Sequence, residues 1–160
     1  LKKEDVPAFL KPYLKFLGLG IPSNLDAWDG YPSERNKLYK VMQKANKNFI
    51  SLAGDTHNSW VSSLTNDEGM KVGIELGAPS VTSPGITDAL KIDKKKFVES
   101  IVGINPELTW MDPSQRGYLS LEFYEEELVA TFNFVKEIEK IDPSISSTHT
   151  IKVKKDQLFT

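Results

Sequence analysis

The residues with the clearest capacity for chemistry are an aspartate and a histidine two positions apart, Asp55 and His57, in the segment GDTHNSW at 54–60. They follow an apolar run at 49–53 that is typical of a buried strand. A carboxylate and an imidazole at this spacing can reach one ion across an irregular turn, and the preceding glycine lets the backbone make that turn. Oxygen with nitrogen suits iron, manganese or zinc, and carboxylates alone suit calcium. The structural alternative is that Asp55 caps a helix beginning near Asn58 and that His57 is an incidental turn residue.

The elements before this pair predict where it lies in the fold. Residues 33–45 repeat apolar side chains at helical spacing behind a candidate N-cap at Ser33. The run at 49–53 is continuously apolar, which is typical of a strand in a parallel sheet covered on both faces. Ligand sites in such α/β folds form preferentially at the C-terminal ends of strands. The order of helix, strand and glycine therefore places Asp55 and His57 where a site is expected.

The residues that follow predict a mixed fold in layers, α/β or α+β. His149 lies in the last alternating stretch and is interpreted as a solvated residue. The acidic run at 125–127 is interpreted as the tip of a hairpin. The expected elements are an extended stretch at 72–83, a helix at 86–102, hairpin strands at 118–123 and 128–135, and an edge strand at 148–155.

Three further residues could contact a ligand. Trp28 and Tyr31 lie in a loop rich in turn residues, and they could form a wall of a substrate cleft by stacking on a leaving group. The alternative is a hydrophobic staple that holds this loop on the core. Arg116 could reach phosphate oxygens through its planar guanidinium, or it could be a surface or structural arginine at the start of a strand.

Composition limits the classes of function. The 160 residues carry 22 acidic and 20 basic side chains, a net charge of -2, which gives no electrostatic reason to expect nucleic acid as a partner. No apolar run approaches the roughly 18 residues of a membrane span, so no span is predicted. The absence of cysteine excludes disulfides, thiolate catalysis and cysteine-based metal sites in this chain.

Four segments occur in an order that resembles a known family. They are NLDAWDGYPSERNKL, SLAGDTHNSW, GAPSVTSPG and INPELTWMDPSQRGYLSLEF, between residues 18 and 136. The chain resembles the C-terminal part of the PhoD-like alkaline phosphatases and phosphodiesterases, which are calcineurin-like metallophosphoesterases. The chain begins with Leu1, and we expect it to be a fragment of a longer gene product.

The resemblance implies site residues, metals and a substrate class. Asp55 and His57 would be metal ligands, with His57 also acting in catalysis, and calcium and iron would be the metals of the complete enzyme. Phosphate mono- or diesters would be the substrates, and the location would be periplasmic or extracellular. One departure is Glu107, which stands where members often have a histidine after Asn-Pro, so any role of that histidine is absent or altered here.

We therefore predict an α/β fold, the C-terminal part of a layered metallophosphoesterase β-sandwich flanked by helices. It comprises a helical lead-in at 1–17, the family region at 18–142 and a tail or edge strand at 143–160. Most family ligands come from earlier segments, so the remaining N-terminal part is the expected partner and the isolated chain should have negligible activity. The alternatives are a non-catalytic partner- or metal-binding chain and one half of a split two-chain active site. Exposed strands would favour a homo-oligomer.

Overall fold

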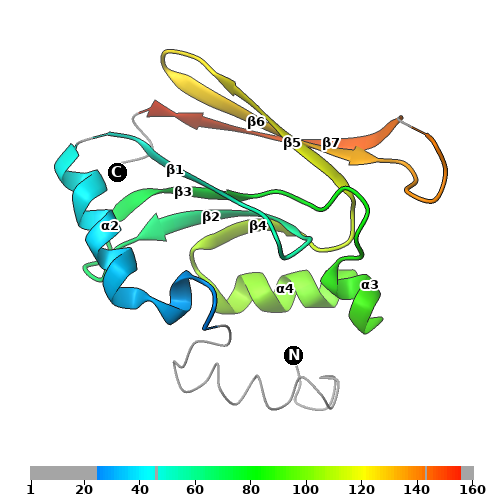
Figure 1. Cartoon of the computed structure of the whole chain (residues 1–160), viewed down its shortest axis with the longest axis horizontal. Coiled ribbons are helices and arrows are strands. Elements are labelled where there is room, and N and C mark those ends of the chain that lie inside the picture. Colours follow the sequence, from blue (N-terminus) through cyan, green and yellow to red (C-terminus); the bar gives the residue numbers. More distant parts are fainter. Residues whose placement is uncertain (1–24, 46, 143, 156–160) are drawn as a thin grey trace. The chain divides into compact units, whose positions relative to one another are not determined.

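The chain divides into two units, residues 1–46 and 47–160. The computed structural model describes residues 25–45, 47–142 and 144–155 (Figure 1). The helical lead-in expected at 1–17 lies outside the described residues. None of the helices among the described residues is long and apolar enough to cross a membrane.

The first unit contains a short 3-10 helix, η1 (Trp28–Gly30), followed by the helix α2 (Pro32–Ala45). The helix expected from the apolar spacing is therefore confirmed. Its start differs from the prediction, because Ser33 lies inside the first turn and does not cap the helix. Proline is well suited to the first helical position because its missing N–H has no intrahelical partner there.

The second unit contains a four-stranded sheet with the order β1-β3-β2-β4. Its first strand, β1 (Phe49–Ala53), is the strand expected from the sequence, and it pairs in parallel with β3. The expectation that both faces are buried is wrong, because β1 is an edge strand and the Leu52 side chain is 60% exposed. In the rest of the sheet, β2 (Ser59–Thr65) pairs antiparallel with both β3 (Lys71–Gly77) and β4 (Leu108–Asp112).

Two helices stand where one was expected at 86–102. The first is α3 (Ile86–Leu90) and the second is α4 (Lys94–Ile104). The break comes at Lys91, whose φ of 52° is left-handed and ends α3. Asp93 then caps α4 by accepting a hydrogen bond from the Lys96 amide at 2.8 Å. In Figure 1, α4 lies on the face of the four-stranded sheet opposite the second sheet.

The second sheet has the order β5-β6-β7 and is antiparallel throughout. The hairpin expected from alternating residues is confirmed as β5 (Gly117–Phe123) and β6 (Glu127–Val135), with the acidic run at its turn. The edge strand is β7 (Ile145–Lys154). This strand begins three residues earlier than the alternation predicts.

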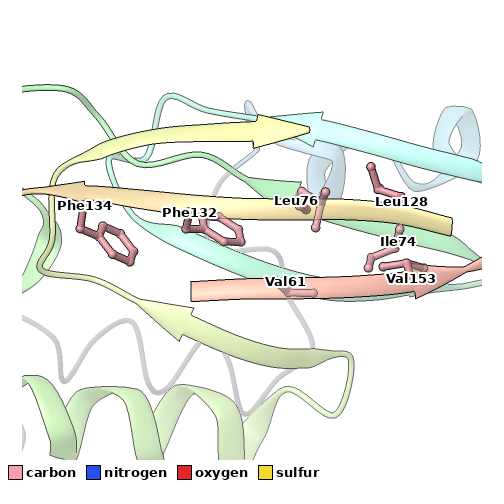
Figure 2. Close-up of a cluster of buried hydrophobic side chains, with 8 residues drawn as sticks. Val61, Ile74, Leu76, Leu128, Phe132, Phe134 and Val153 are labelled. Carbon is pink, nitrogen blue, oxygen red and sulfur yellow. The ribbon is translucent and has the colours of Figure 1, made fainter. Parts of the chain in front are cut away.

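The two sheets pack face to face around one apolar core (Figure 2). Every second residue of β6 is buried, so one face of this central strand points entirely into the core. The four-stranded sheet supplies side chains from β2 and β3, and β7 adds one more. The buried core residues are Val61, Ile74, Leu76, Leu128, Ala130, Phe132, Phe134 and Val153.

His149 is half-buried and its ring packs on Trp110, which borders this core, so its interpretation as a solvated residue is wrong. Its ring stacks on Trp110 at a centroid distance of 4.0 Å and an interplanar angle of 5°. Phe132 lies beside it, with ring centroids 6.2 Å apart. The Nε2 atom is buried and has no hydrogen-bond partner among the described residues. Burial lowers the pKa of His149, and the negative charge of Asp112 opposes this shift.

Replacing Phe132 by alanine tests the core. Phe132 is fully buried, so we expect the free energy of unfolding to fall by about 3–5 kcal/mol, measured by urea denaturation. Phe123 lies on the neighbouring strand β5 but is 67% exposed, and Phe123→Ala is the matched control, with an expected loss of about 1 kcal/mol or less. Equal losses in both variants would contradict a core centred on β6.

Replacing His149 by phenylalanine tests the pH dependence of this packing. Because the folded-state pKa is below 6.5, the unfolded chain binds the proton more tightly, and the folded state loses stability as the pH falls through that value. The phenylalanine keeps an aromatic ring against Trp110 but cannot be protonated. We expect wild type to lose more unfolding free energy than His149→Phe between about pH 8 and pH 5. Equal losses of unfolding free energy in wild type and His149→Phe, measured by urea denaturation, would contradict this expectation.

Candidate functional site

The segment between β1 and β2 has an unusual backbone at the two residues singled out from the sequence. Asp55 has a φ of 68° and His57 a φ of 61°, both in the left-handed region. Aspartate and histidine enter this region more readily than most residues, but the conformation is still uncommon and is often found at functional sites. The segment directly follows the C-terminal end of β1. The predicted location of the pair in the fold is therefore confirmed, while its metal-binding role stays a prediction.

The orientation of the His57 ring is set by a backbone carbonyl. Its Nδ1 atom lies 3.2 Å from the oxygen of Pro84. A carbonyl oxygen only accepts hydrogen bonds, so a hydrogen bond here requires the tautomer in which Nδ1 carries the proton and donates it. In the neutral imidazole the other nitrogen, Nε2, then keeps its lone pair. Histidines that bind metals usually donate their second nitrogen to a carbonyl or carboxylate in this way.

Asn58 anchors the same segment through hydrogen bonds of its side chain. Its side chain is buried, with an exposed fraction of 5%. The amide nitrogen donates to the Thr56 carbonyl at 2.6 Å, and the amide oxygen accepts from the Ile86 backbone at 3.2 Å. The next residue begins a strand, so the alternative of a helix capped by Asp55 is wrong. The role of Asn58 is not predicted from the sequence, because its partner Ile86 lies 28 residues away along the chain.

Arg116 lies at the start of β5, where the sequence placed it, and is almost completely buried. Its side chain is 5% exposed and pairs with the Asp88 carboxylate. Its Nη1 atom also donates to the Gln115 carbonyl at 2.8 Å. Asp88 and Arg116 both line an open depression with a volume of about 560 Å³. These contacts agree with the structural alternative for Arg116, and substrate contact stays a prediction.

Asp112 organises the turn that carries Arg116. Its carboxylate accepts hydrogen bonds from Ser114 and Gln115 and pairs with the Lys94 ammonium at 2.7 Å. Burial alone would raise the pKa of Asp112, but these partners together lower it to about 2. Gln115 in turn accepts a hydrogen bond from Ser147 of β7 at 2.9 Å. The turn is therefore tied to both sheets.

Trp28 and Tyr31 lie in the first unit. Each is 51% exposed, and both line an open pocket of about 440 Å³ together with Asp26, Ala27 and Glu34. Nearby, Arg35 pairs with Asp29 at 2.7 Å. Half-exposed aromatic rings are available for stacking on a ligand. The role of Trp28 and Tyr31 as a wall of a substrate cleft stays a prediction.

Glu107 binds within the protein rather than near the segment 54–58. Its carboxylate accepts hydrogen bonds from the backbone and the hydroxyl of Thr65. Thr65 ends β2, whereas the segment with Asp55 and His57 precedes the start of that strand. In this chain Glu107 therefore stabilises the end of the sheet where β2 ends and β4 begins.

The donor set at 54–58 fits part of a metal centre. The Asp55 carboxylate is exposed and has no hydrogen-bond or ion-pair partner among the described residues, and the Nε2 of His57 offers a lone pair. No group of three or more acidic or histidine side chains that could hold a metal occurs within the part of the chain that the structure describes. These residues could therefore supply two ligands, with the others coming from elsewhere.

Comparison with known proteins points to one family. The model of the PhoD-like phosphatase family matches residues 3–132. Alkaline phosphatase D of Bacillus subtilis (strain 168) is 28% identical over 139 residues, which cover 84% of this chain and 23% of that protein. A solved structure of PhoD matches with a TM-score of 0.68 and 26% identity, over 84% of this chain and 26% of that one. The chain thus spans about a quarter of the length of the relatives it matches.

The pKa of Asp112 gives a test of the turn. Because the folded-state pKa of about 2 is below the ordinary 3.8, the charged carboxylate stabilises the fold above pH 3.8, and this stabilisation is lost as the pH falls towards 2. We expect Asp112→Asn to lower the free energy of unfolding at neutral pH by about 1–3 kcal/mol. The difference from wild type should shrink as the pH approaches 2, and urea denaturation at several pH values measures it.

The control for this test is Glu125→Gln, which removes a charge from the exposed hairpin tip. It should change stability by about 0.5 kcal/mol or less at every pH. A difference between Asp112→Asn and wild type that stays constant down to pH 2 would contradict the role given to the charge.

Proposed function

The chain belongs to the PhoD-like phosphatase family, and from this premise we propose that it supplies two metal ligands to an enzyme that hydrolyses phosphate esters. The ligands are Asp55 and His57 of the Gly-Asp-x-His loop. The substrates are phosphate mono- or diesters. The observation that carries this proposal is the hydrogen bond from the Nδ1 of His57 to the Pro84 carbonyl. This bond leaves the lone pair of Nε2 available to bind a metal ion.

The two side chains have complementary tasks in this proposal. The exposed Asp55 carboxylate provides negative charge, and His57 provides a neutral nitrogen whose direction is fixed by the Pro84 carbonyl. A metal ion bound there would supply Lewis-acid chemistry by neutralising charge on phosphoryl oxygens. By resemblance to the family the metals are calcium and iron. In its proposed catalytic role, when it does not bind the metal itself, the Nε2 lone pair of His57 would accept a hydrogen bond from the attacking water.

The centre needs further ligands, because the described residues contain no group of three or more side chains that could hold a metal. We propose that they come from the N-terminal part of a PhoD-like enzyme, in one polypeptide with this chain or as a second chain in a split active site. Trp28 and Tyr31, both half-exposed, would stack on the leaving group. By resemblance to the family, we propose a periplasmic or extracellular location for the complete enzyme.

A non-catalytic metal- or partner-binding chain is the second candidate. It is supported by the absence of a third ligand among the described residues. The strand β1 supports this candidate as well. It lies at the edge of its sheet and its residue Leu52 is 60% exposed, and an uncovered edge strand can pair with another chain or a second copy.

Manganese titration followed by NMR tests the ligand pair in the 160-residue chain. Paramagnetic Mn²⁺ broadens nearby amide signals even when binding is only millimolar, which corresponds to about 4 kcal/mol. We expect broadening first at residues 54–58. Asp55→Asn and His57→Asn should remove it, because each loses a ligand while asparagine tolerates the left-handed backbone.

The matched control is Glu125→Gln, an exposed acid on the β5–β6 turn, and it should leave the broadening at 54–58 unchanged. Broadening centred on the acidic run 125–127, with no effect of Asp55→Asn, would contradict the ligand assignment. Hydrolysis of bis(p-nitrophenyl) phosphate separates the two candidates. Turnover that appears only when the N-terminal part of a PhoD-like enzyme is supplied supports the enzyme, and no turnover in either case supports the binding chain.

A further inference from the structure

The peptide group between Pro84 and Gly85 is held at both of its polar atoms. Its carbonyl oxygen accepts the hydrogen bond from the Nδ1 of His57 at 3.2 Å. Its N–H, on the Gly85 side, donates to the Oδ2 atom of Asp88 at 3.3 Å. Because a peptide group is planar, whatever fixes the direction of the N–H also fixes the direction of the carbonyl. Asp88 therefore helps to aim the oxygen that orients His57.

Arg116 fixes Asp88 in turn. The Nη2 atom of Arg116 binds the same Oδ2 atom that accepts the Gly85 amide. The Arg116 side chain is 5% exposed, whereas that of Asp88 is 52% exposed, so the buried guanidinium restrains a carboxylate that would otherwise move in solvent. Its second hydrogen bond, from Nη1 to the Gln115 carbonyl at 2.8 Å, holds the guanidinium itself.

Gly85 shows how closely this arrangement is packed. A Cβ atom at this position would lie 2.2 Å from the Pro113 oxygen and 2.8 Å from Nη2 of Arg116. Only glycine allows the turn to approach both groups. Thr87 adds a buried hydrogen bond to the same Pro113 oxygen at 3.1 Å. The segment 84–88, which includes the start of α3, is thus fixed against the turn that carries Arg116.

Building on the proposed function, we propose that Arg116 and Asp88 are positioning residues for His57. They hold the Pro84–Gly85 peptide so that its carbonyl accepts the Nδ1 proton and the Nε2 lone pair of His57 remains available to a ligand. In this proposal Arg116 acts on His57 through Asp88. Partners of this kind typically change metal affinity by about 10- to 100-fold when they are removed.

The tautomer of His57 can be observed directly, without any metal. The chain has two histidines, so ¹⁵N NMR of the imidazole nitrogens gives a spectrum of two rings, and the His149→Phe variant assigns them. At about pH 8 an ordinary histidine is neutral. We expect His57 in the wild-type chain to show one dominant tautomer, protonated at Nδ1.

Three variants test the positioning of His57 by Asp88 and Arg116. Asp88→Ala removes the acceptor of the Gly85 N–H, and Arg116→Met removes the group that holds Asp88. Both should convert the single His57 tautomer into a mixture in which Nε2 is protonated in a substantial fraction. Arg116→Lys keeps a charge that can reach Asp88 without the planar fork, so it should restore the wild-type tautomer in part. The Mn²⁺ affinity at 54–58 should fall by about 10-fold or more in Asp88→Ala.

Two controls separate positioning from loss of stability. Arg35→Met removes an arginine–aspartate pair elsewhere in the chain and should leave the tautomer unchanged. Phe132→Ala lowers stability through the core and, where it remains folded, should also keep the tautomer. An unchanged tautomer in folded Asp88→Ala and Arg116→Met chains would overturn the positioning role. The tautomer is read without metal, so failure of Mn²⁺ binding with a tautomer shift would count against the proposed function alone.

Discussion

The packing of β6 against the four-stranded sheet is the constraint on which the rest of the second unit depends. The turn at 112–117 leaves one sheet at the end of β4 and enters the other at the start of β5, so its position is fixed only when the two sheets are in contact. The Val135 amide of β6 donates to the Arg116 carbonyl at 2.9 Å. Burial of β6 therefore places Arg116 with respect to the turns that surround His57.

Two buried charges on this turn have different effects. Asp112 is satisfied by Lys94 and by groups of its own turn, so its charge maintains the local backbone. Arg116 instead reaches a separate segment through Asp88. A buried charge is costly to desolvate unless its partners are well placed. When the two sheets are in contact, the turn at 112–117 therefore fixes the position of the 84–88 segment through the pairing of Arg116 with Asp88.

The sequence predicted the elements whose signals are local. The β5–β6 hairpin has clear alternation, β1 is a short apolar run, and Asp55 and His57 follow that strand directly. The strands β2 and β4 were missed because neither alternates cleanly, and the break at Lys91 has no glycine or proline to mark it. The pairing of Arg116 with Asp88 spans 28 residues and depends on the sheet packing, so no spacing rule reveals it.

The backbone of the segment 54–58 connects this scaffold to chemistry. Left-handed conformations at non-glycine residues cost about 1–3 kcal/mol each and persist only where the surroundings enforce them. Here the enforcement comes from outside the segment, through the Asn58 bond to Ile86 and the His57 bond to Pro84. The resulting loop exposes the Asp55 carboxylate and holds the His57 ring against the Pro84 carbonyl. The left-handed backbone at Asp55 and His57 is thus held from other segments, and the pairing of Arg116 with Asp88 holds the Pro84–Gly85 peptide in turn.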